Sequence, residues 1–283
     1  LTQELQEYLL YGRIQKVNQP FDRELVLTIR NHRQNFKLLL SAHPVFGRIQ
    51  MTKTDFQNPQ IPNTFTMIMR KYLQGALIES IQQVENDRIL QISFSNKNEI
   101  GDQLKVSLIV EIMGKHSNII LIDQNEGKII ESIKHVGFAQ NSYRTILPGS
   151  AYLAPPKNQT QNPFAISDDK LFEILQTQEL SPKNLQQLFQ GLGRDTASQL
   201  AFSLDRDRLK NFRRFFKQET APNLTETSFS AVHFTDSQES FDSLSALLDV
   251  FYQDKAERDR ISQQASDLIH RIQNELSKNK KKL

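Results

Sequence analysis

The adjacent residues Asp87 and Arg88 stand where a polar turn leads into the apolar run RILQISF (88–94). A guanidinium next to a carboxylate can present paired N–H donors to a phosphate or to the edge of a base. The same two residues can also form an exposed ion pair, which contributes little free energy. From these residues alone, the exposed ion pair is the simpler interpretation.

A second polar turn, Gly114 to Asn118, separates two apolar runs in EIMGKHSNIILID (111–123). His116 is a residue type suited to acid–base chemistry, but no nucleophile and no third member of a triad can be assigned beside it. Lys115, His116 and Asn118 could instead form a hydrogen-bonding surface for a phosphate or a sugar. A simple hairpin turn explains the pattern equally well, and we keep it as the interpretation from the residues alone.

The segment LFQGLGRDTASQLA (188–201) contains two glycines around one leucine, with apolar residues at helical spacing on both sides. This pattern is typical of a helix-hairpin-helix. Gly191 and Gly193 permit positive φ and close approach of a ligand, and the free N–H groups of the following helix can bind a phosphate. Arg194 would add a positive charge. The alternative is an ordinary αα-hairpin in which glycine caps a helix.

The next segment, SLDRDRLKNFRRFFK (203–217), carries basic residues at the spacing i, i+4, i+7 and i+11, namely Arg206, Lys210, Arg213 and Lys217. On one helix these side chains would form a stripe. Such a stripe favours contact with a nucleic-acid backbone through charge neutralisation and counterion release. The alternative is a solvated helix face, with Asp205 and Asp207 partly neutralising it.

Other kinds of chemistry find no support in the sequence. The chain has no cysteine, and its six histidines show neither H-x-x-x-H nor H-E-x-x-H spacing, so no zinc site is indicated. Phosphate-binding P-loops and the dinucleotide motif G-x-G-x-x-G are also missing from the sequence. We therefore predict no catalytic residues, no metal and no cofactor.

Size and composition suit a soluble globular protein. The chain has 283 residues, 38% hydrophobic and 24% charged, with a net charge of +3, which allows two domains with real cores. No apolar run reaches 18 residues, so we expect no membrane insertion. No secretory signal is visible and the chain lacks an initiator Met. We expect a cytoplasmic protein whose natural start lies upstream.

Periodicity along the chain predicts an α+β fold. Helical spacing occurs at residues 1–11 and 65–73, and strand-like runs separated by polar turns fill most of the remainder of 1–150, which predicts a mostly antiparallel sheet. We place a connector at 151–167 and short helices at 168–222. A return segment, expected to contain one strand that packs back on a domain, follows at 223–251. Apolar residues spaced by three and four positions then predict the start of a coiled coil at 252–283.

Several of these segments together resemble one family. GRIQKVNQPFDRELVLTIR, KLLLSAHPVFGRIQMT, NPQIPNTFTMIMRKYLQGALIESIQQVENDRI, EIGD, EIMGKHSNIILID and YRTILPGSAYLAPP occur in this order. They are similar to the NFACT N-terminal region of the RqcH/NEMF proteins, whose bacterial members are also called fibronectin-binding protein A or PavA-like. The resemblance covers essentially the whole chain. It implies an N-terminal domain like that of formamidopyrimidine-DNA glycosylases, then a helix-hairpin-helix domain and the start of a coiled coil.

The resemblance also implies a role in ribosome-associated quality control. Family members bind large ribosomal subunits that carry stalled nascent chains, and they recruit tRNA, alanine tRNA in bacteria, for untemplated C-terminal tailing. The family's Asp-Arg motif matches Asp87 and Arg88, which reverses the simpler interpretation given above. The family's E-I-M-G-[KR]-H-S-N block matches 111–118, so Glu111, Lys115, His116 and Asn118 are expected on the same tRNA-binding surface.

Three consequences of the resemblance need qualification. A short segment with Phe-Asp-Gly, which contributes to tRNA engagement in the family, is missing from the start of this sequence. Glycosylase activity is not expected, because those enzymes use an N-terminal proline and a cysteine zinc finger, and shared fold does not imply shared reaction. The family's other name suggests an alternative role as a surface adhesin for fibronectin, reached without a signal peptide.

Overall fold

The computed structural model describes residues 1–283 except 98–100, 157–158, 227, 233–237 and 281–283. Its N-terminal part is one antiparallel sheet with the strand order β4-β3-β2-β1-β5-β6-β7-β8-β9. The strands are β1 (Arg13–Phe21), β2 (Glu24–Asn31), β3 (Gln34–Ser41), β4 (Arg48–Met51), β5 (Leu77–Gln83), β6 (Ile89–Lys97), β7 (Gln103–Glu111), β8 (Asn118–Asp123) and β9 (Ile129–Ser132). The predicted α+β class and the antiparallel arrangement are confirmed.

The sheet consists of two groups of strands that meet at β1 and β5. These two strands share the single register pair Arg13–Leu77, while the pairings on either side are long. Helix α1 (Thr2–Leu9) and helix α2 (Thr64–Leu73) supply apolar side chains to the same core as the strands. The core therefore lies where the apolar alternation of the strands and the helical apolar faces meet.

Local signals explain where α2 begins and ends. The side chain of Asn63 accepts a hydrogen bond from the backbone N–H of Thr66 at 2.9 Å, which caps the start of the helix. After the last helical residue the chain reverses at Gly75, whose φ of +81° suits glycine. Phe65, Met69 and Leu73 follow the helical period and are buried. The predicted helix and its stop at Gly75 are confirmed.

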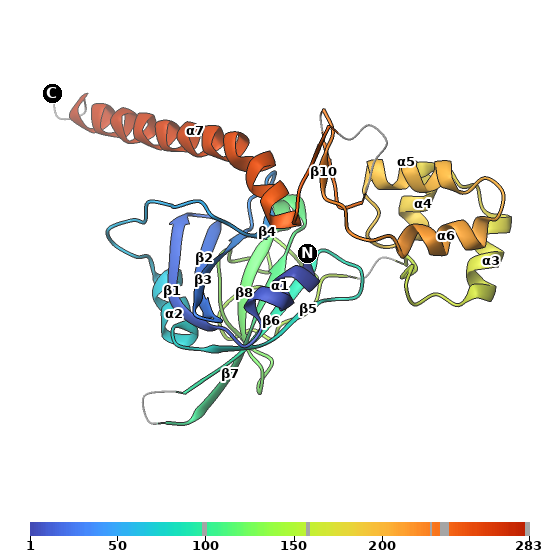
Figure 1. The fold of residues 1–283 in the computed structure, drawn as a ribbon. Coiled ribbons are helices and arrows are strands. Elements are labelled where there is room, and N and C mark those ends of the chain that lie inside the picture. The colour runs from blue at the N-terminus through green and yellow to red at the C-terminus, as the bar shows by residue number, and fades with distance from the viewer. Residues whose placement is uncertain (98–100, 157–158, 227, 233–237, 281–283) are drawn as a thin grey trace.

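A second core belongs to four short helices, shown at the right of Figure 1: α3 (Asp168–Thr177), α4 (Pro182–Leu188), α5 (Arg194–Ser203) and α6 (Arg208–Phe216). Leu185, Phe189 and Phe212 are fully buried there. Ser167, Ser181 and Asp207 cap α3, α4 and α6 through their side-chain oxygens, as expected for these residue types. Helices α4 and α5 flank the two glycines and form the predicted hairpin.

The return segment contains three short strands rather than the single strand we expected. They are β10 (Asn223–Leu224), β11 (Phe229–Ser230) and β12 (Glu239–Ser240), and they pair in the order β11-β10-β12. Residues 227 and 233–237 of this segment lie outside the described part of the chain. The prediction missed the extra strands because each spans only two residues, too short for a periodic pattern.

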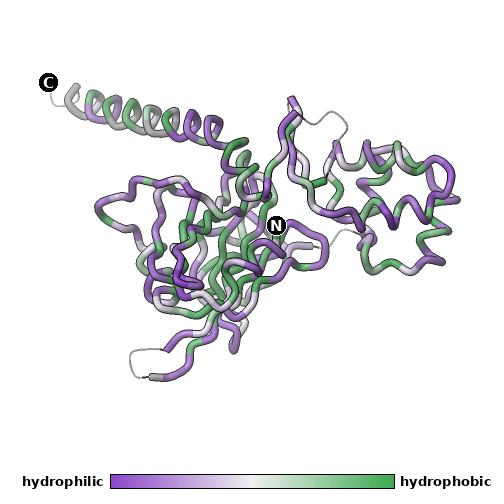
Figure 2. Tube along the Cα trace, viewed as in Figure 1, coloured by the Kyte–Doolittle hydropathy of each residue, from purple (hydrophilic) through white to green (hydrophobic). Residues whose placement is uncertain are grey.

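Helix α7 (Leu244–Lys280) begins eight residues before the predicted coiled coil, and its first turns pack against the sheet. Arg260 donates to Glu24 at 2.6 Å, and Ser245 accepts the backbone N–H of Met51 at 3.0 Å. Beyond this contact the apolar stripe is exposed, with Leu268 at 59% and Ile272 at 51%, and Figure 2 shows the alternation of apolar and polar residues there. Residues 244–260 are thus a helical segment that packs against the sheet. Pairing of the exposed apolar stripe with another helix, as in a coiled coil, stays a prediction.

The long helix is not suited to a membrane. Among the described residues no helix is both long enough and apolar enough to span one.

Candidate functional site

A cleft of about 420 Å³ lies between the β5–β6 turn and the glycine turn that joins α4 to α5. Asp87 and Arg88 line one side of it, and Gly191 and Gly193 line the other. Two segments that sequence analysis singled out for separate reasons, about a hundred positions apart, therefore share one cleft. Pro155 and Pro156 of the connector lie between them.

The backbone of the β5–β6 turn is held in place by its own hydrogen bonds. Glu85 has a positive φ of +53°, and the N–H of Asp87 donates to the carbonyl of Val84 at 3.1 Å. The carbonyl of Arg88 accepts the N–H of Ile112 at 2.9 Å. This last bond places Arg88 next to the start of the 113–117 turn.

The side chains of Asp87 and Arg88 do not form an ion pair with each other. The Asp87 carboxylate accepts the backbone N–H of Arg88 at 2.7 Å. Both side chains are exposed, and within the described part of the chain the Arg88 guanidinium has no hydrogen bond or ion pair. The interpretation as an exposed ion pair is therefore wrong. The donors of Arg88 are available to a ligand.

The space beside the Cα of Gly191 is filled by another part of the protein. Its φ is +76°, and a Cβ at this position would lie 2.3 Å from the Asn86 side-chain nitrogen and 2.8 Å from the Asn86 carbonyl oxygen. The Asn86 side chain donates to the carbonyl of Gln190 at 2.9 Å. The glycine thus permits close packing of the hairpin against the β5–β6 turn, which fixes the two sides of the cleft relative to each other.

The space beside the Cα of Gly193, in contrast to that beside Gly191, is empty. It is the N-cap residue of α5, and a Cβ built on it would meet nothing within 4 Å. The N-cap residue supplies no capping side chain, so α5 begins at the cleft residue Gly193 with uncapped N–H groups at the positive end of the helix dipole. Arg194 is exposed at the first helical position. Only this half of the glycine turn fits the predicted phosphate contact.

The predicted basic stripe needs correction at two positions. Helix α6 begins at Arg208, so Arg206 precedes the helix and does not share its face. Arg213 is bound within the domain: its guanidinium donates to Asp168 at 2.7 Å and to the carbonyl of Ile166 at 2.6 Å. These contacts hold the connector onto α6 and leave Arg213 unsuited to a nucleic-acid contact.

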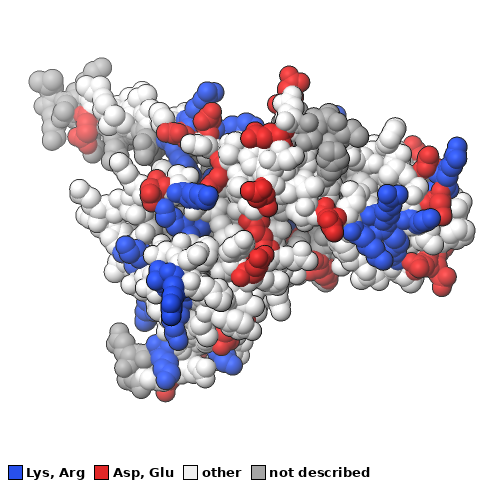
Figure 3. All heavy atoms as spheres, in the orientation of Figure 1, with Lys and Arg blue, Asp and Glu red and all other residues white. Residues whose placement is uncertain are grey.

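Four other basic residues around α6 are exposed. They are Arg206, Lys210, Lys217 and, missed by the sequence analysis, Arg214. Figure 3 shows Lys and Arg side chains gathered over the helical domain, with acidic side chains at the edges. Arg214 lies four positions after Lys210 and therefore on the same face of the helix. Had the sequence analysis placed the start of α6 at Asp207, it would have assigned Arg214 rather than Arg213 to the exposed face.

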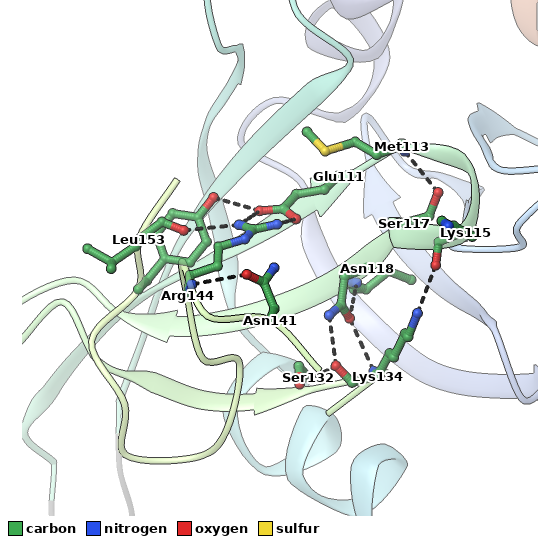
Figure 4. Close-up of polar contacts among 12 residues, drawn as sticks. Glu111, Met113, Lys115, Ser117, Asn118, Ser132, Lys134, Asn141, Arg144 and Leu153 are labelled. Carbon is green, nitrogen blue, oxygen red and sulfur yellow. Dashed lines mark hydrogen bonds and ion pairs between the residues drawn. The ribbon is translucent and has the colours of Figure 1, made fainter. Parts of the chain in front are cut away.

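Glu111 is fully buried, which contradicts its predicted place on a tRNA-binding surface. Arg144 donates to both of its carboxylate oxygens, at 2.7 and 2.6 Å, and the Tyr152 hydroxyl donates at 2.9 Å (Figure 4). Burial, together with the neighbouring Glu111 carboxylate, raises the pKa of Tyr152. The cluster joins the end of β7 to the 144–153 segment and has a structural role.

Asn118 is also buried and cannot face a partner. Its side-chain nitrogen donates to the carbonyl of Lys134 at 2.8 Å, and its side-chain oxygen accepts the N–H groups of Ile119 and Lys134 (Figure 4). Lys115 and His116, by contrast, are exposed on the short 3₁₀ helix Gly114–His116. Of the four residues predicted in this block, only these two remain candidates.

No group of three or more His, Asp or Glu side chains is placed to hold a metal ion among the described residues. The cleft is lined by the Arg88 guanidinium, the two carboxylates of Glu85 and Asp87, several amide side chains and a few apolar side chains. The groups at this cleft that can bind an anion are the Arg88 guanidinium and the start of α5 at Gly193.

Comparison with known proteins identifies close relatives. The chain is 66% identical over 286 residues to the Rqc2 homolog RqcH of Streptococcus suis (strain 05ZYH33) and 38% identical over 299 residues to that of Bacillus subtilis (strain 168). In both comparisons the match covers 100% of this chain and 52% of the relative. The chain therefore spans about half the length of the curated relatives it matches.

Solved structures of similar proteins share the fold. The N-terminal part of a fibronectin/fibrinogen-binding protein from Streptococcus suis has a TM-score of 0.87 at 67% identity, covering 89% of this chain and 96% of that one. A fibrinogen binding protein from Staphylococcus aureus has a TM-score of 0.76 at 33% identity, covering 88% and 95%. The family model of NFACT N-terminal and middle domains matches residues 1–283. The chain belongs to this NFACT family, with RqcH proteins among its relatives.

Proposed function

We propose that this chain is the tRNA-binding part of a ribosome-associated quality control factor. The complete protein would bind large ribosomal subunits with stalled nascent chains and recruit tRNA, alanine tRNA in this case, for untemplated C-terminal tailing. Peptidyl transfer would be performed by the ribosome, so the chain itself acts by binding and not as an enzyme.

One observation carries the assignment of the site. Arg88 is exposed in the cleft without a partner in the described part of the chain, opposite the open N-terminus of α5 at Gly193. A guanidinium and free helix N–H groups on two sides of one cleft suit a nucleic-acid backbone held between them. Arg194 and the exposed basic residues of α6 extend positive charge from one side of the cleft.

The exposed turn beside Arg88 enlarges the proposed surface. Lys115 and His116 follow directly on the strand that pairs with Arg88, through the bond from the N–H of Ile112. The Asp87 carboxylate would keep accepting the hydrogen bond from the backbone N–H of Arg88 and would so orient the turn. The surface therefore combines a fixed backbone with flexible cationic side chains.

The experiment is tRNA binding by the 283-residue chain at two salt concentrations. Asp87→Ala/Arg88→Ala should weaken alanine tRNA binding by roughly 10- to 100-fold, because hydrogen bonds to charged groups are worth about 1.5–3 kcal/mol. It should also make the slope of log K against log salt shallower by about one, which corresponds to the loss of one phosphate contact. A non-cognate tRNA tests selectivity.

The chain offers a matched control in the dipeptide Asp22-Arg23, in the β1–β2 turn outside the cleft. Asp22→Ala/Arg23→Ala removes the same two residue types and the same charges. Neither variant changes the net charge of the chain, so equal losses in both would mean that the loss does not depend on the cleft, and the site assignment would then be wrong.

Fibronectin binding is an alternative proposal that rests on names. Two structural relatives are described as fibronectin- or fibrinogen-binding proteins, and no residue of this chain is assigned to such a contact. Saturable fibronectin binding by the chain, together with no binding of any tRNA, would replace the quality control proposal.

A further inference from the structure

A second groove, of about 600 Å³, lies on the outward face of β1, β2 and β3. It shares no lining residue with the cleft, and these strands lie at the opposite side of the sheet domain from the helical domain (Figure 1). We call it the outer-face groove. Its polar and charged lining residues are Gln15, Lys16, Asn18, Thr28, Arg30, Asn35, Lys37, Asp55 and Asn58.

The outer-face groove carries an excess of positive charge. Lys37 pairs with Asp55 at 2.5 Å, and Asp55 is the single acidic residue among the lining side chains. Lys16 and Arg30 are exposed and form no ion pair with any residue that the structure describes. The groove is otherwise lined largely by amide side chains, which donate hydrogen bonds to oxygen. This combination fits phosphate oxygens.

The strand register places Arg30 of the groove opposite another arginine, Arg13, which is not one of the lining residues. Arg13 on β1 lies directly opposite Arg30 on β2, and like charges facing each other across strands are destabilising. Among the described residues, the partners of their guanidiniums are neutral groups, the carbonyl of Gly75 and the side-chain oxygen of Asn35, each at 3.2 Å. A bound anion would remove the repulsion that the fold leaves uncompensated.

The turn at the open end of the groove shows backbone strain. His32 and Arg33 form the two-residue loop between β2 and β3, with φ of +45° and +64°. Both positive φ values correspond to a type I′ turn, for which Asn-Gly is strongly preferred. The described residues include two more non-glycine positions with positive φ, Tyr11 and Glu85, and Glu85 adjoins the proposed tRNA site. Strained positions of this kind cluster at functional sites.

We propose that the outer-face groove, together with Arg13 opposite Arg30 and Arg33 in the β2–β3 loop, is a second binding site for an RNA phosphate backbone. From Arg13 to Lys16 the strand extends roughly 10 Å at about 3.3 Å per residue, which is farther than the oxygens of one phosphate group reach. The cations are too widely spaced for one phosphate, so the ligand is a polyanion. That this polyanion is RNA rests on the proposed function.

The test compares two charge-matched triple variants of the 283-residue chain. Lys16→Gln/Arg30→Gln/Arg33→Gln alters the groove, and Lys97→Gln/Lys105→Gln/Lys170→Gln removes the same charge from exposed positions outside it. Binding to tRNA and to intact large ribosomal subunits is measured as a function of salt. The groove variant should bind at least tenfold more weakly, with a slope of log K against log salt that is shallower by about two. The control variant should retain its slope.

A second variant separates binding from folding. His32→Asn/Arg33→Gly introduces the preferred type I′ residues, so its melting temperature should rise while its RNA affinity falls. A structural role for these residues would give the opposite change in melting temperature and would overturn the proposal.

Comparing the cleft variant with the groove variant also separates this inference from the proposed function. Asp87→Ala/Arg88→Ala should leave the contribution of the groove to the salt slope unchanged, and losses from the cleft and groove variants should add. Loss with tRNA only or with ribosomal subunits only identifies which RNA occupies the groove. Equal RNA binding by the groove variant and the control variant would overturn the inference. This holds even if the groove variant binds heparin more weakly than the control variant does.

Discussion

Replacing Gly191 by alanine should separate the two sides of the cleft. The new Cβ would lie 2.3 Å from the side-chain nitrogen of Asn86 and 2.8 Å from its carbonyl oxygen, at a residue with φ of +76°. The left-handed conformation costs an alanine about 1–2 kcal/mol. Loss of the hydrogen bond from Asn86 to the carbonyl of Gln190 adds about 1 kcal/mol. We expect a total destabilisation of about 2–3 kcal/mol.

The matched control is alanine at Gly193, two residues along the same turn. Gly193 has a φ of −75°, and its Cβ would meet nothing within 4 Å. Only the weaker N-cap preference of alanine acts there, about 0.5–1 kcal/mol. Urea denaturation measures both changes, and tRNA binding shows whether the β5–β6 turn has moved. The reasoning fails if the two variants lose the same stability and Gly191→Ala binds tRNA like the unmodified chain.

Three further outcomes are expected. Arg144→Ala should destabilise the fold by about 3–5 kcal/mol in urea denaturation, because it leaves the buried Glu111 carboxylate without its cation; a loss below about 1 kcal/mol would contradict this. The pKa of Tyr152 is raised above the ordinary tyrosine value of 10.0, so its contribution to the free energy of unfolding is complete below pH 10 and decreases as pH rises further. The stability difference between Tyr152→Phe and the unmodified chain should therefore shrink above pH 10, and a constant difference would refute this reasoning. Arg260→Ala should weaken the packing of residues 244–260, because the ion pair with Glu24 and the stacking on two phenylalanine rings are lost; unchanged hydrogen exchange there would show that the contact is unimportant.

Local patterns predicted most of the elements but not their long-range contacts. The strands of the sheet follow from apolar runs between polar turns, and α2 follows from residues at helical spacing with a glycine after it. The two glycines of the hairpin were recognised for the same reason. Each of these signals lies within about a dozen residues of sequence.

The errors concern pairings between distant segments. Glu111 and Asn118 lie in a turn-like segment that reads as exposed, and they are buried because Arg144 and the carbonyl of Lys134 bind them. Arg213 fits a basic stripe, but its partners, Ile166 in the connector and Asp168 at the start of α3, lie 45 or more positions earlier. Burial of a polar side chain depends on partners that no local period can indicate.

The cleft itself is another consequence of long-range packing. The sequence identified Asp87 and Arg88 and, separately, the glycine turn, but it contained no indication that Asn86 packs against Gly191. The docking of α7 was missed for a similar reason, because Glu24 and Arg260 are 236 positions apart. The helical pattern was recognised, and the surface it packs on was not.

Site-specific photo-crosslinking gives the most direct test of the central claim that tRNA is bound in the cleft. A photoreactive amino acid is placed at Gln186, an exposed residue that lines the cleft, in one sample and at Arg23 in the other, each mixed with alanine tRNA. We predict a tRNA crosslink from position 186, competed away by unlabelled tRNA, and none from position 23. Crosslinking from position 23 alone, or from neither position under conditions where the chain binds tRNA, would contradict the proposed site.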